Sequence, residues 1–528
     1  MKKSDFTAVS TAENNTEIAV LKARVSELET LVKYYEEQFR IAKHRQFGAS
    51  SEKSEYDFTQ LSLFNEAELF ADANVPEPEL VEVEKHYRKR TRLTTDKLPE
   101  DLPVEIVEYD LPESERICPE CGGPLHVMGH ETRRELVIIP AQVKIREHVR
   151  KIYACRDCEK DECGVPILKS QTDEPVIKGS FASPETIAHL MTQKFVMGSP
   201  LYRQEKELKQ NGIMLSRQTM SNWLIRATED WLEPIYDELH EMLCTYDVLH
   251  ADETTLQVLR EPGKTAQSKS YMWLYRTGGD AKHPIVLYDY QPDRRAKRPA
   301  EFLKNFKGFL HTDGYDGYHS LKEEISVVGC WAHVRRKFDE ALKALPERDR
   351  EGSNVLRGKR YCDRLFGFER EFESLKPEER YLKRQEHSKP LLDEFFAWAS
   401  ALNATPKTGI GVAVHYALSQ RKYLERYLLD GRLEISNNRA ERSIKPFVID
   451  RKNFLFSNTP RGAKASAVMF SLIETAKENG LNPYEYLVYV FKNAPNLNIR
   501  NDIDALWGLS PTTDTSHFHP SSDSCSSI

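Results

Sequence analysis

GFLHTDGYDGY, residues Gly308–Tyr318, places a carboxylate directly after a short apolar run. Phe309 and Leu310 are typical of a buried strand, and Asp313 follows beside Gly314, which allows a sharp turn. Taken alone, this pattern fits a plain strand and polar turn better than a catalytic site. It predicts chemistry only if further carboxylates reach the same edge of a sheet.

A second acid lies upstream, in a segment that also has the pattern of a strand. Tyr246–Leu259, YDVLHADETTLQVL, is rich in apolar and β-branched residues and contains Asp252. Two more strands are predicted at Tyr271–Arg276 and Pro284–Tyr290, and a short helix is predicted at 302–306. The chain therefore shows three consecutive strands and a helix before the strand that precedes the Gly308–Tyr318 turn.

This order of elements is the start of a ribonuclease-H-like sheet. In such a sheet the first and fourth strands are neighbours, so Asp252 and Asp313 would face each other. Two carboxylates this close repel each other, and a divalent cation bound between them removes the repulsion. We therefore expect a metal site at this edge.

The third acid, Glu441, stands in a basic and asparagine-rich segment. Ser436–Lys464 contains seven Lys or Arg and two acids, a net charge of 7 − 2 = +5. An isolated glutamate one turn after Asn437 and Asn438, which suit a helix start, favours a metal ligand surrounded by phosphate-binding groups. Glu434 is the competing choice, although it precedes that helix start.

A basic helix and a long helical segment lie between the second and third acids. CWAHVRRKF, at Cys330–Phe338, predicts the start of a helix. Its His333, Arg335 and Arg336 fit either contact with DNA or metal-bound phosphate, or a solvated helix face. Residues 345–430 show helical periods and no strand signal, which indicates a helical insertion within the sheet domain.

Two CxxC pairs predict a structural zinc site. Their four thiolates would complete a tetrahedral site and leave no open position for water, so a catalytic zinc is not expected. The residues between the pairs alternate like strands and would form a small zinc ribbon. Cys163 is a spare thiol that could replace the last ligand. The predicted ligands are Cys118, Cys121, Cys155 and Cys158.

A helix-turn-helix pattern follows the cysteine-containing region. Gly212 closes one helical segment, and Ser216 can cap the next, SRQTMSNWLIRA. The second helix carries Arg217 and Gln218 at its start, as a DNA-recognition helix would. An ordinary helical hairpin is the alternative.

The N-terminal segment carries a heptad pattern. Its apolar residues step by three and four positions: Ile18, Leu21, Val25, Leu28, Val32, Tyr35 and Phe39. This seam favours a self-associating coiled coil, with a helix packed within the chain as the alternative. An acidic linker follows, and then the basic run Lys85–Arg92, which fits either solvated charges or an arm that contacts phosphates.

The composition limits the class of protein. The 528 residues are enough for several domains, and 75 basic against 82 acidic residues give a net charge of −7. Glu55–Glu84 alone holds nine acids and no Lys or Arg, which leaves −7 + 9 = +2 elsewhere, so basic patches are possible. No apolar run reaches the ~18 residues of a membrane span, and the N-terminus lacks the apolar core of a signal peptide. Nine cysteines, four of them in CxxC pairs, favour a reducing cytoplasm.

Four motifs together resemble the transposases of the insertion-sequence 66 family. They are HADET at His250–Thr254, LHTDGYDGY at Leu310–Tyr318, CWAHVRRKF, and NNRAERSIKP followed by DRKNFLF. The resemblance runs from the heptads to at least Phe491. Two positions depart from the family pattern: Asp450 stands where glycine is usual, and Lys445 replaces an arginine before proline. Neither departure removes an acid of the proposed site.

The resemblance implies a DDE-type transposase. Its triad would be Asp252, Asp313 and Glu441, which would hold two Mg²⁺ or Mn²⁺ ions for DNA strand cleavage and strand transfer. Its partners would be the element's terminal repeats, target DNA, a second copy of the chain and two accessory proteins of the element. We expect a cytoplasmic, nucleoid-associated protein. The residues assigned to DNA binding are Arg217, Gln218, Arg335, Arg336, Lys445, Arg451 and Lys452.

These observations predict a multidomain α+β chain with a coiled coil, a zinc ribbon, a helix-turn-helix and a ribonuclease-H-like α/β catalytic domain that contains a helical insertion. The expected boundaries are 1–54 for the coiled coil, 55–110 for the acidic linker and basic arm, 111–170 for the zinc-binding domain, 180–235 for the helix-turn-helix, 240–480 for the catalytic domain with its insertion at about 345–430, and 481–528 for a C-terminal helix and disordered tail.

Overall fold

The computed structural model describes residues 143–149, 152–154, 167–169, 172–497 and 508–512. The chain divides into two compact units, one of them residues 50–170. In that unit β1 (Ile152–Ala154) pairs antiparallel with β2 (Ile167–Lys169). The predicted coiled coil, acidic linker, basic arm, zinc-binding cysteines and most of the C-terminal tail lie outside the described residues.

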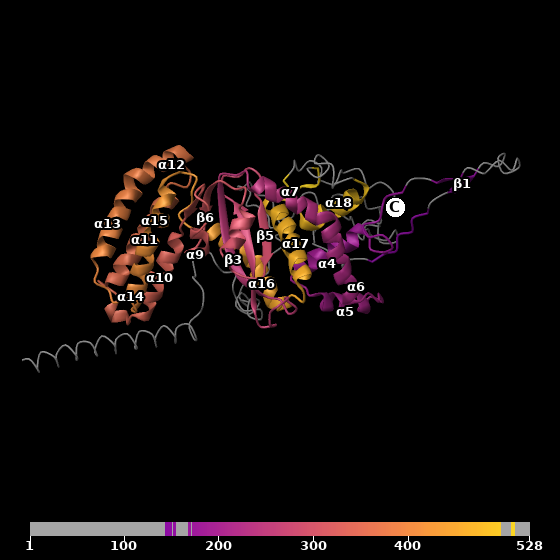
Figure 1. Ribbon diagram of the computed structural model, residues 1–528, viewed down its shortest axis with the longest axis horizontal. Helices are drawn as coiled ribbons and strands as arrows, with labels where there is room; N and C mark the ends of the chain where they lie inside the picture. The colour runs from indigo at the N-terminus through magenta and orange to yellow at the C-terminus, as the bar shows by residue number, and fades with distance from the viewer. Residues whose placement is uncertain (1–142, 150–151, 155–166, 170–171, 498–507, 513–528) are drawn as a thin grey trace, which may run out of the picture. The chain divides into compact units, whose positions relative to one another are not determined.

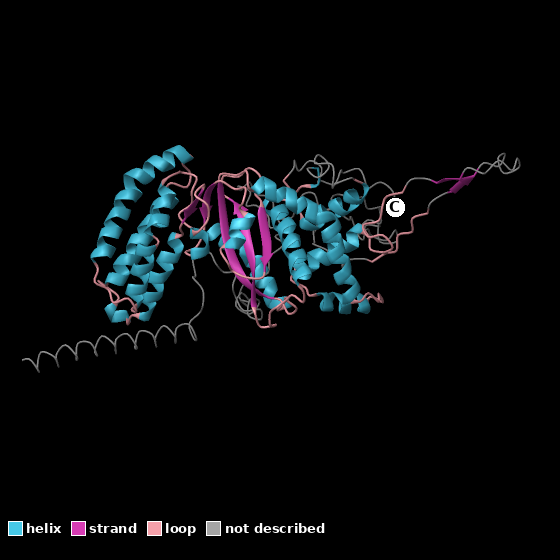
Figure 2. Cartoon of the chain, in the orientation of Figure 1, coloured by secondary structure: helices cyan, strands magenta, loops and turns pink. Residues whose placement is uncertain are grey.

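A mixed five-stranded sheet lies at the centre of the other unit (Figures 1 and 2). Its strand order is β5-β4-β3-β6-β7. Within this sheet β3 with β4 and β4 with β5 pair antiparallel, whereas β3 with β6 and β6 with β7 pair parallel. The strands are β3 (Val248–Gln257), β4 (Lys269–Thr277), β5 (Val286–Gln291), β6 (Gly308–His311) and β7 (Ile325–Val328).

The four strands predicted for this sheet are present, and β3 and β6 are neighbours as expected. The short helix between β5 and β6 differs from the prediction. It is α8 (Lys297–Phe302), which ends where the predicted helix 302–306 begins. Pro299 suits the first turn of α8. Phe306 is buried in the turn that follows α8, so its apolar character reflects burial rather than the face of a helix.

The edge strand β5 is covered by α17 (Pro460–Glu478) rather than by another strand. Ser471 Oγ accepts the Tyr288 N–H at 2.7 Å, and Thr475 Oγ1 accepts the Val286 N–H at 3.0 Å. These two buried hydroxyls therefore satisfy backbone groups that an edge strand would otherwise expose.

The helix α16 (Asn438–Phe454) packs across β3 and β4. Its buried residues Ala440, Ile444 and Phe447 are spaced by four and three positions, so they form one face toward the sheet. Because Asn437 precedes the first turn, Glu441 falls one turn into the helix, as the sequence predicted.

The helix α10 (Trp331–Ala344) leads from β7 into a helical bundle with its own hydrophobic core. In Figure 1 this bundle forms one end of the unit. Residues 345–430 contain helices and turns and no strand, in agreement with the helical signal of the sequence. The bundle helices are α11 (Asn354–Glu371), α12 (Pro377–Lys383), α13 (Lys389–Ala401), α14 (Gly409–Ser419) and α15 (Arg421–Leu424).

A buried arginine connects this bundle to the segment that returns toward α16. Arg384 is fully buried, and its guanidinium binds Glu369 through Nε at 2.9 Å and Nη2 at 2.6 Å. It also donates to the carbonyl oxygens of Tyr427, Asp430 and Leu433. The Arg384 side chain thus binds acceptors in the bundle and in the returning segment, and it holds the two together.

A second group of helices packs around α17, at the β5 edge of the sheet and away from the bundle (Figure 2). Ser183 caps α4, accepting the Thr186 N–H at 3.1 Å. Ser216 caps α6 as predicted, accepting the Thr219 N–H at 3.1 Å. The helices are α4 (Pro184–Phe195), α5 (Leu201–Gln210), α6 (Arg217–Ala227), α7 (Glu233–Leu243) and α18 (Pro483–Asn493).

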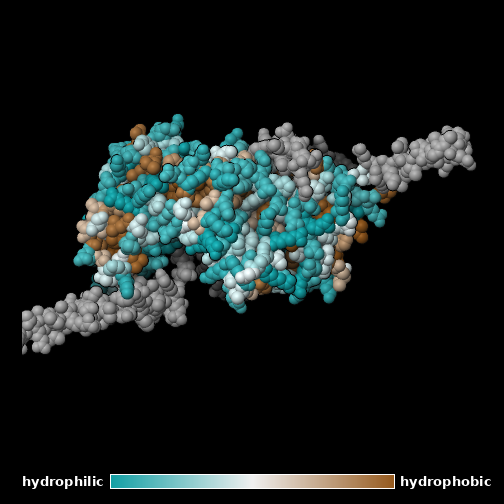
Figure 3. All heavy atoms as spheres, in the orientation of Figure 1, coloured by the Kyte–Doolittle hydropathy of each residue, from teal (hydrophilic) through white to brown (hydrophobic). Residues whose placement is uncertain are grey.

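Hydrophilic residues cover most of the face shown in Figure 3, and apolar patches appear over the helical bundle. The exposed apolar residues of the bundle include Leu382, Val412 and Leu429. Among the described residues, the helices are too short or too polar to span a lipid bilayer.

Candidate active site

The strand register places two aspartates at the same level of the sheet. β3 and β6 run parallel, and His250 is paired with His311. Asp252 and Asp313 each lie two residues further along, beyond the last residue of β6 in the case of Asp313. Because side chains alternate along a strand, each aspartate lies on the same face as the histidine before it.

The two histidines form a buried layer next to the aspartates. Their rings are stacked at a centroid distance of 4.4 Å and an interplanar angle of 10°, and neither residue is exposed. Burial lowers the pKa of His250 to about 3 and lowers that of His311 well below its usual value, so both rings are neutral at pH 7.

Asn437 connects this layer to the start of α16. Its Oδ1 lies 2.9 Å from His250 Nδ1, and its Nδ2 donates to the Ala251 carbonyl at 2.8 Å. The amide nitrogen of Asn437 is therefore already used on β3, and the neutral His250 ring must donate to Oδ1. These bonds fix the first turn of α16, and with it the backbone of Glu441, relative to β3.

The three acids line one open cavity of about 280 Å³. Asp252 comes from β3, Asp313 from the end of β6 and Glu441 from α16. The other lining residues are His333, Arg336, Asn437, Ile444 and Lys445. The structure thus brings together the three acids that the sequence selected from segments up to 189 positions apart.

The electrostatics of the cavity are unfavourable for the acids alone. Burial, followed by the charges of Glu253 and Asp313, raises the pKa of Asp252 well above its usual value. Asp252 Oδ1 accepts the Glu253 N–H at 2.8 Å, and Asp313 Oδ1 accepts the Tyr315 N–H at 2.9 Å. Oxygen donors that repel one another in this way fit a hard divalent cation, which would neutralise them.

Neighbouring acids have other partners. Glu253 accepts the Tyr318 hydroxyl at 2.6 Å and binds Arg294, so its carboxylate is held within the fold. The side chain of Asp316, in contrast, is 96% exposed at the start of α9 (Asp316–His319). Neither residue lines the cavity.

The competing glutamate of the sequence, Glu434, also lies outside the lining. Its carboxylate binds Arg439 Nε at 2.5 Å and is 4.0 Å from His250 Nε2. Glu441 has weaker contacts, with Arg336 Nη2 at 3.3 Å from Oε2 and His333 Nε2 at 3.8 Å from Oε1. Its carboxylate is therefore the one that remains available to a ligand in the cavity.

The residues predicted to contact DNA divide into three groups. Arg336 and Lys445 line the cavity. Arg335 Nε instead binds Asp363 of α11 at 2.7 Å, and the guanidinium of Arg451 binds Thr254 Oγ1 at 3.1 Å and the Thr255 carbonyl on β3. The third group is exposed and includes Lys452, near the end of α16.

Arg217 and Gln218 belong to the third group, at the start of α6. Gln218 is exposed, and Arg217 Nε is 3.9 Å from Glu205 of α5. A six-residue turn joins the two helices, so they have the connectivity of a helix-turn-helix. A second cavity of about 570 Å³ is lined by α6 and by Phe181 and Arg461, among others.

Sequence reasoning did not identify the stacked histidines or the role of Asn437. A signal was present, because HAD at 250–252 and HTD at 311–313 repeat the pattern His-x-Asp before each predicted ligand. Cys330 was also missed. Its Sγ accepts the Asn437 N–H at 3.2 Å, directly beside the cavity.

Comparison with known proteins places these features in one family. The Transposase IS66 family matches residues 179–465, and the zinc-finger binding domain of transposase IS66 matches 115–159. The IS66 C-terminal element matches 471–507, and the family described as Transposase C of IS166 homeodomain matches 34–107.

Two relatives from Sinorhizobium fredii match most of the chain. The uncharacterized protein y4hP is 32% identical over 411 residues, which are 74% of this chain and 72% of the relative. The uncharacterized protein y4jD is 30% identical over 408 residues, 74% of this chain and 77% of the relative. With a family match over more than half of its length, this chain belongs to the IS66 transposase family.

Proposed function

We propose that this protein catalyses metal-dependent cleavage and joining of DNA strands at the ends of an insertion element. The observation that carries the proposal is the convergence of Asp252, Asp313 and Glu441 on one open cavity. The strand order β5-β4-β3-β6-β7, with three antiparallel strands followed by two parallel ones, supports a ribonuclease-H-like catalytic domain.

The three carboxylates would hold the divalent cations. Their oxygen donors suit Mg²⁺ or Mn²⁺, and the raised pKa of Asp252 reflects burial and, after it, the neighbouring carboxylate charges, both of which a bound cation would offset. When bound, such ions would activate the attacking water or 3′-hydroxyl and stabilise the leaving oxygen of the phosphodiester.

The other lining residues would place the DNA. Arg336 and Lys445 bring positive charge to the cavity, where a phosphodiester would have to enter. Asn437 holds the start of α16 on β3, which keeps Glu441 level with the two aspartates. In this arrangement the chain supplies position and charge, and no covalent protein–DNA intermediate is required.

Other parts of the chain would recognise the element. The match to the zinc-finger binding domain includes Cys118, Cys121, Cys155 and Cys158 and ends before Cys163, which supports a structural zinc held by the first four. Arg217 and Gln218, in the first turn of α6, would read a DNA groove. The N-terminal heptads would pair two copies, so that both element ends are cut together.

The test is a cleavage assay on labelled DNA that carries the inverted repeats flanking the coding region. The full-length protein with Mg²⁺ should nick the element end and give joined products with a target plasmid. Asp313→Asn should bind the same DNA and give neither product. Binding without cleavage by the wild type would identify a DNA-binding regulator instead, and cleavage without joined products would identify a stand-alone nuclease.

A further inference from the structure

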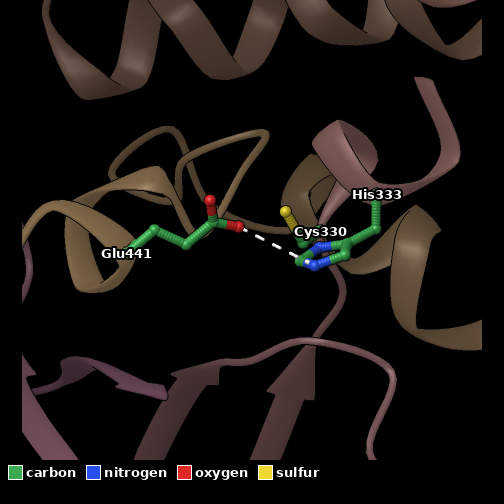
Figure 4. A group of neighbouring side chains, drawn as sticks. All are labelled: Cys330, His333 and Glu441. Carbon is green, nitrogen blue, oxygen red and sulfur yellow. Dashed lines mark ion pairs between the residues drawn. The ribbon is translucent and has the colours of Figure 1, made fainter. Parts of the chain in front are cut away.

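A cysteine, a histidine and a glutamate meet at one side of the cavity (Figure 4). Cys330 directly precedes α10, and His333 lies in the first turn of that helix. Glu441 comes from α16 and extends toward the imidazole ring. One ligand atom from each of the three side chains lies within 4.8 Å of the others.

Two polar atoms of this cluster have no partner within the described part of the fold, whereas Cys330 Sγ accepts the Asn437 N–H. His333 Nδ1 and Glu441 Oε1 are buried and have no hydrogen-bond partner among the described residues. The contact between His333 Nε2 and Glu441 Oε1, at 3.8 Å, is too long for a hydrogen bond. Buried polar atoms without partners are costly in a folded protein, so these two atoms are suited to bind a ligand.

The chemistry of the donors differs from that of the triad. A thiol sulfur, an imidazole nitrogen and a carboxylate oxygen are ligands of Zn²⁺ and related transition metals, whereas Mg²⁺ prefers oxygen alone. Donor atoms bound to one zinc ion lie about 3.5 Å apart, so the three would have to approach by about 1 Å. Rotation of the Glu441 and His333 side chains, which are 27% and 24% exposed, can provide this movement.

We propose that Cys330, His333 and Glu441 form a second metal site, for an ion of the zinc class, that shares Glu441 with the catalytic site. An ion held there draws the Glu441 carboxylate toward Cys330 and His333 and away from the two aspartates. Zinc-class ions would therefore inhibit the Mg²⁺-dependent reaction. This consequence rests on the proposed function, whereas the binding of the metal does not.

Cobalt absorption tests the binding directly. The full-length protein is first given one equivalent of Zn²⁺, which the four-thiolate site takes up before the second site, and is then titrated with Co²⁺, which binds thiolates more weakly than zinc and does not displace it there. Thiolate bound to Co²⁺ absorbs in the near ultraviolet, so the wild type should develop this band.

Three variants assign the band. Cys330→Ser should abolish it, and its hydroxyl can still accept the Asn437 N–H, so the fold is retained and can be checked by thermal unfolding. His333→Ala should weaken Co²⁺ binding by at least about tenfold. The control is Cys244→Ser, because Cys244 is another free cysteine outside the cluster, and it should leave the band unchanged. The absence of the absorption band in the wild type, or an equally strong band in Cys330→Ser, would contradict the proposed second metal site.

Zinc inhibition of cleavage tests the shared glutamate. Cys330→Ser should require at least about tenfold more Zn²⁺ than the wild type for half-inhibition at fixed Mg²⁺. Equal inhibition of both proteins would overturn the coupling to catalysis. If the wild type cleaves no DNA with Mg²⁺, the proposed function fails, and the cobalt band still decides whether the metal site exists.

Discussion

The two sides of the cavity are built differently. On the sheet side, Asp252 and Asp313 follow a fully buried, stacked pair of histidines on adjacent strands. On the helix side, Glu441 is partly exposed, and its contacts with the side chains of α10 are 3.3 and 3.8 Å long. The sheet side therefore fixes the positions of its acids, whereas the helix side leaves its glutamate able to move.

This difference suggests that the aspartates and the glutamate contribute to the site in different ways. A rigid pair of aspartates can define where a cation and a phosphodiester are placed, while a movable glutamate can complete that site or bind elsewhere. Asn437 joins the two sides, since it binds His250 and Ala251 on β3 and begins α16. Substitutions on each side and at this junction should have different consequences.

The largest effect is expected on the sheet side, from Asp313→Asn. Loss of one carboxylate should reduce the cleavage rate by at least about 10³-fold, because cation-mediated charge stabilisation contributes several kcal/mol. The same change removes one of the charges that raise the pKa of Asp252, so the metal-free protein should be no less stable than the wild type. Cleavage kinetics and thermal unfolding measure the two effects.

Asp316→Asn is the matched control for this experiment. Asp316 lies three residues further along the same turn, and its side chain is 96% exposed. We expect cleavage close to that of the wild type. A loss as complete as that of Asp313→Asn would mean that the wrong aspartate of GFLHTDGYDGY was assigned to the metal.

Local patterns explain why much of this site was predictable. Apolar runs identified β3 and β6, and each acid was selected because it lay inside or directly after such a run. Glu441 was found from the asparagines and basic residues around it, which are also local features. The adjacency of β3 and β6 followed from the order of the elements rather than from any single residue.

The rest depended on contacts between distant segments. The stacking of His250 on His311 requires the exact pairing of two strands, and the bond from His250 to Asn437 spans 187 positions. Arg451 looked like a phosphate ligand because it is basic, yet its guanidinium is bonded to β3. Composition alone cannot separate a charge that is used within the fold from one that is available to DNA.

An intermediate effect is expected at the junction, from Asn437→Ala. This change removes the partner of the buried His250 Nδ1 and of the Ala251 carbonyl, so the free energy of unfolding should fall by about 2 kcal/mol. Cleavage should also decrease, because the start of α16 is no longer held on β3. Urea unfolding and cleavage rates at a fixed folded fraction separate the two losses.

The neighbouring Asn438→Ala provides the comparison. Asn438 is the first residue of α16 and is only half-buried. Its substitution should change the free energy of unfolding by less than about 1 kcal/mol. Equal losses in both variants would show that helix initiation, rather than the bond to the sheet, explains the effect of Asn437.

The smallest effect is expected at the far end of α16, from Asp450→Asn. Asp450 is 6% exposed, and burial raises its pKa to about 6, although the nearby charge of Lys194 opposes the increase. Because this folded-state pKa is above the ordinary value of 3.8, the fold loses stability as the pH rises through about 6. An uncharged asparagine should avoid that loss and raise the free energy of unfolding at pH 7 by about 1 kcal/mol, with no gain at pH 4.

Cleavage by Asp450→Asn should not change, since Asp450 is far along the helix from Glu441. A lower stability of Asp450→Asn at pH 7 would instead show that the attraction between Asp450 and Lys194 outweighs the cost of burying the carboxylate, and that α16 is anchored by charge at this end as well as by Asn437 at the other.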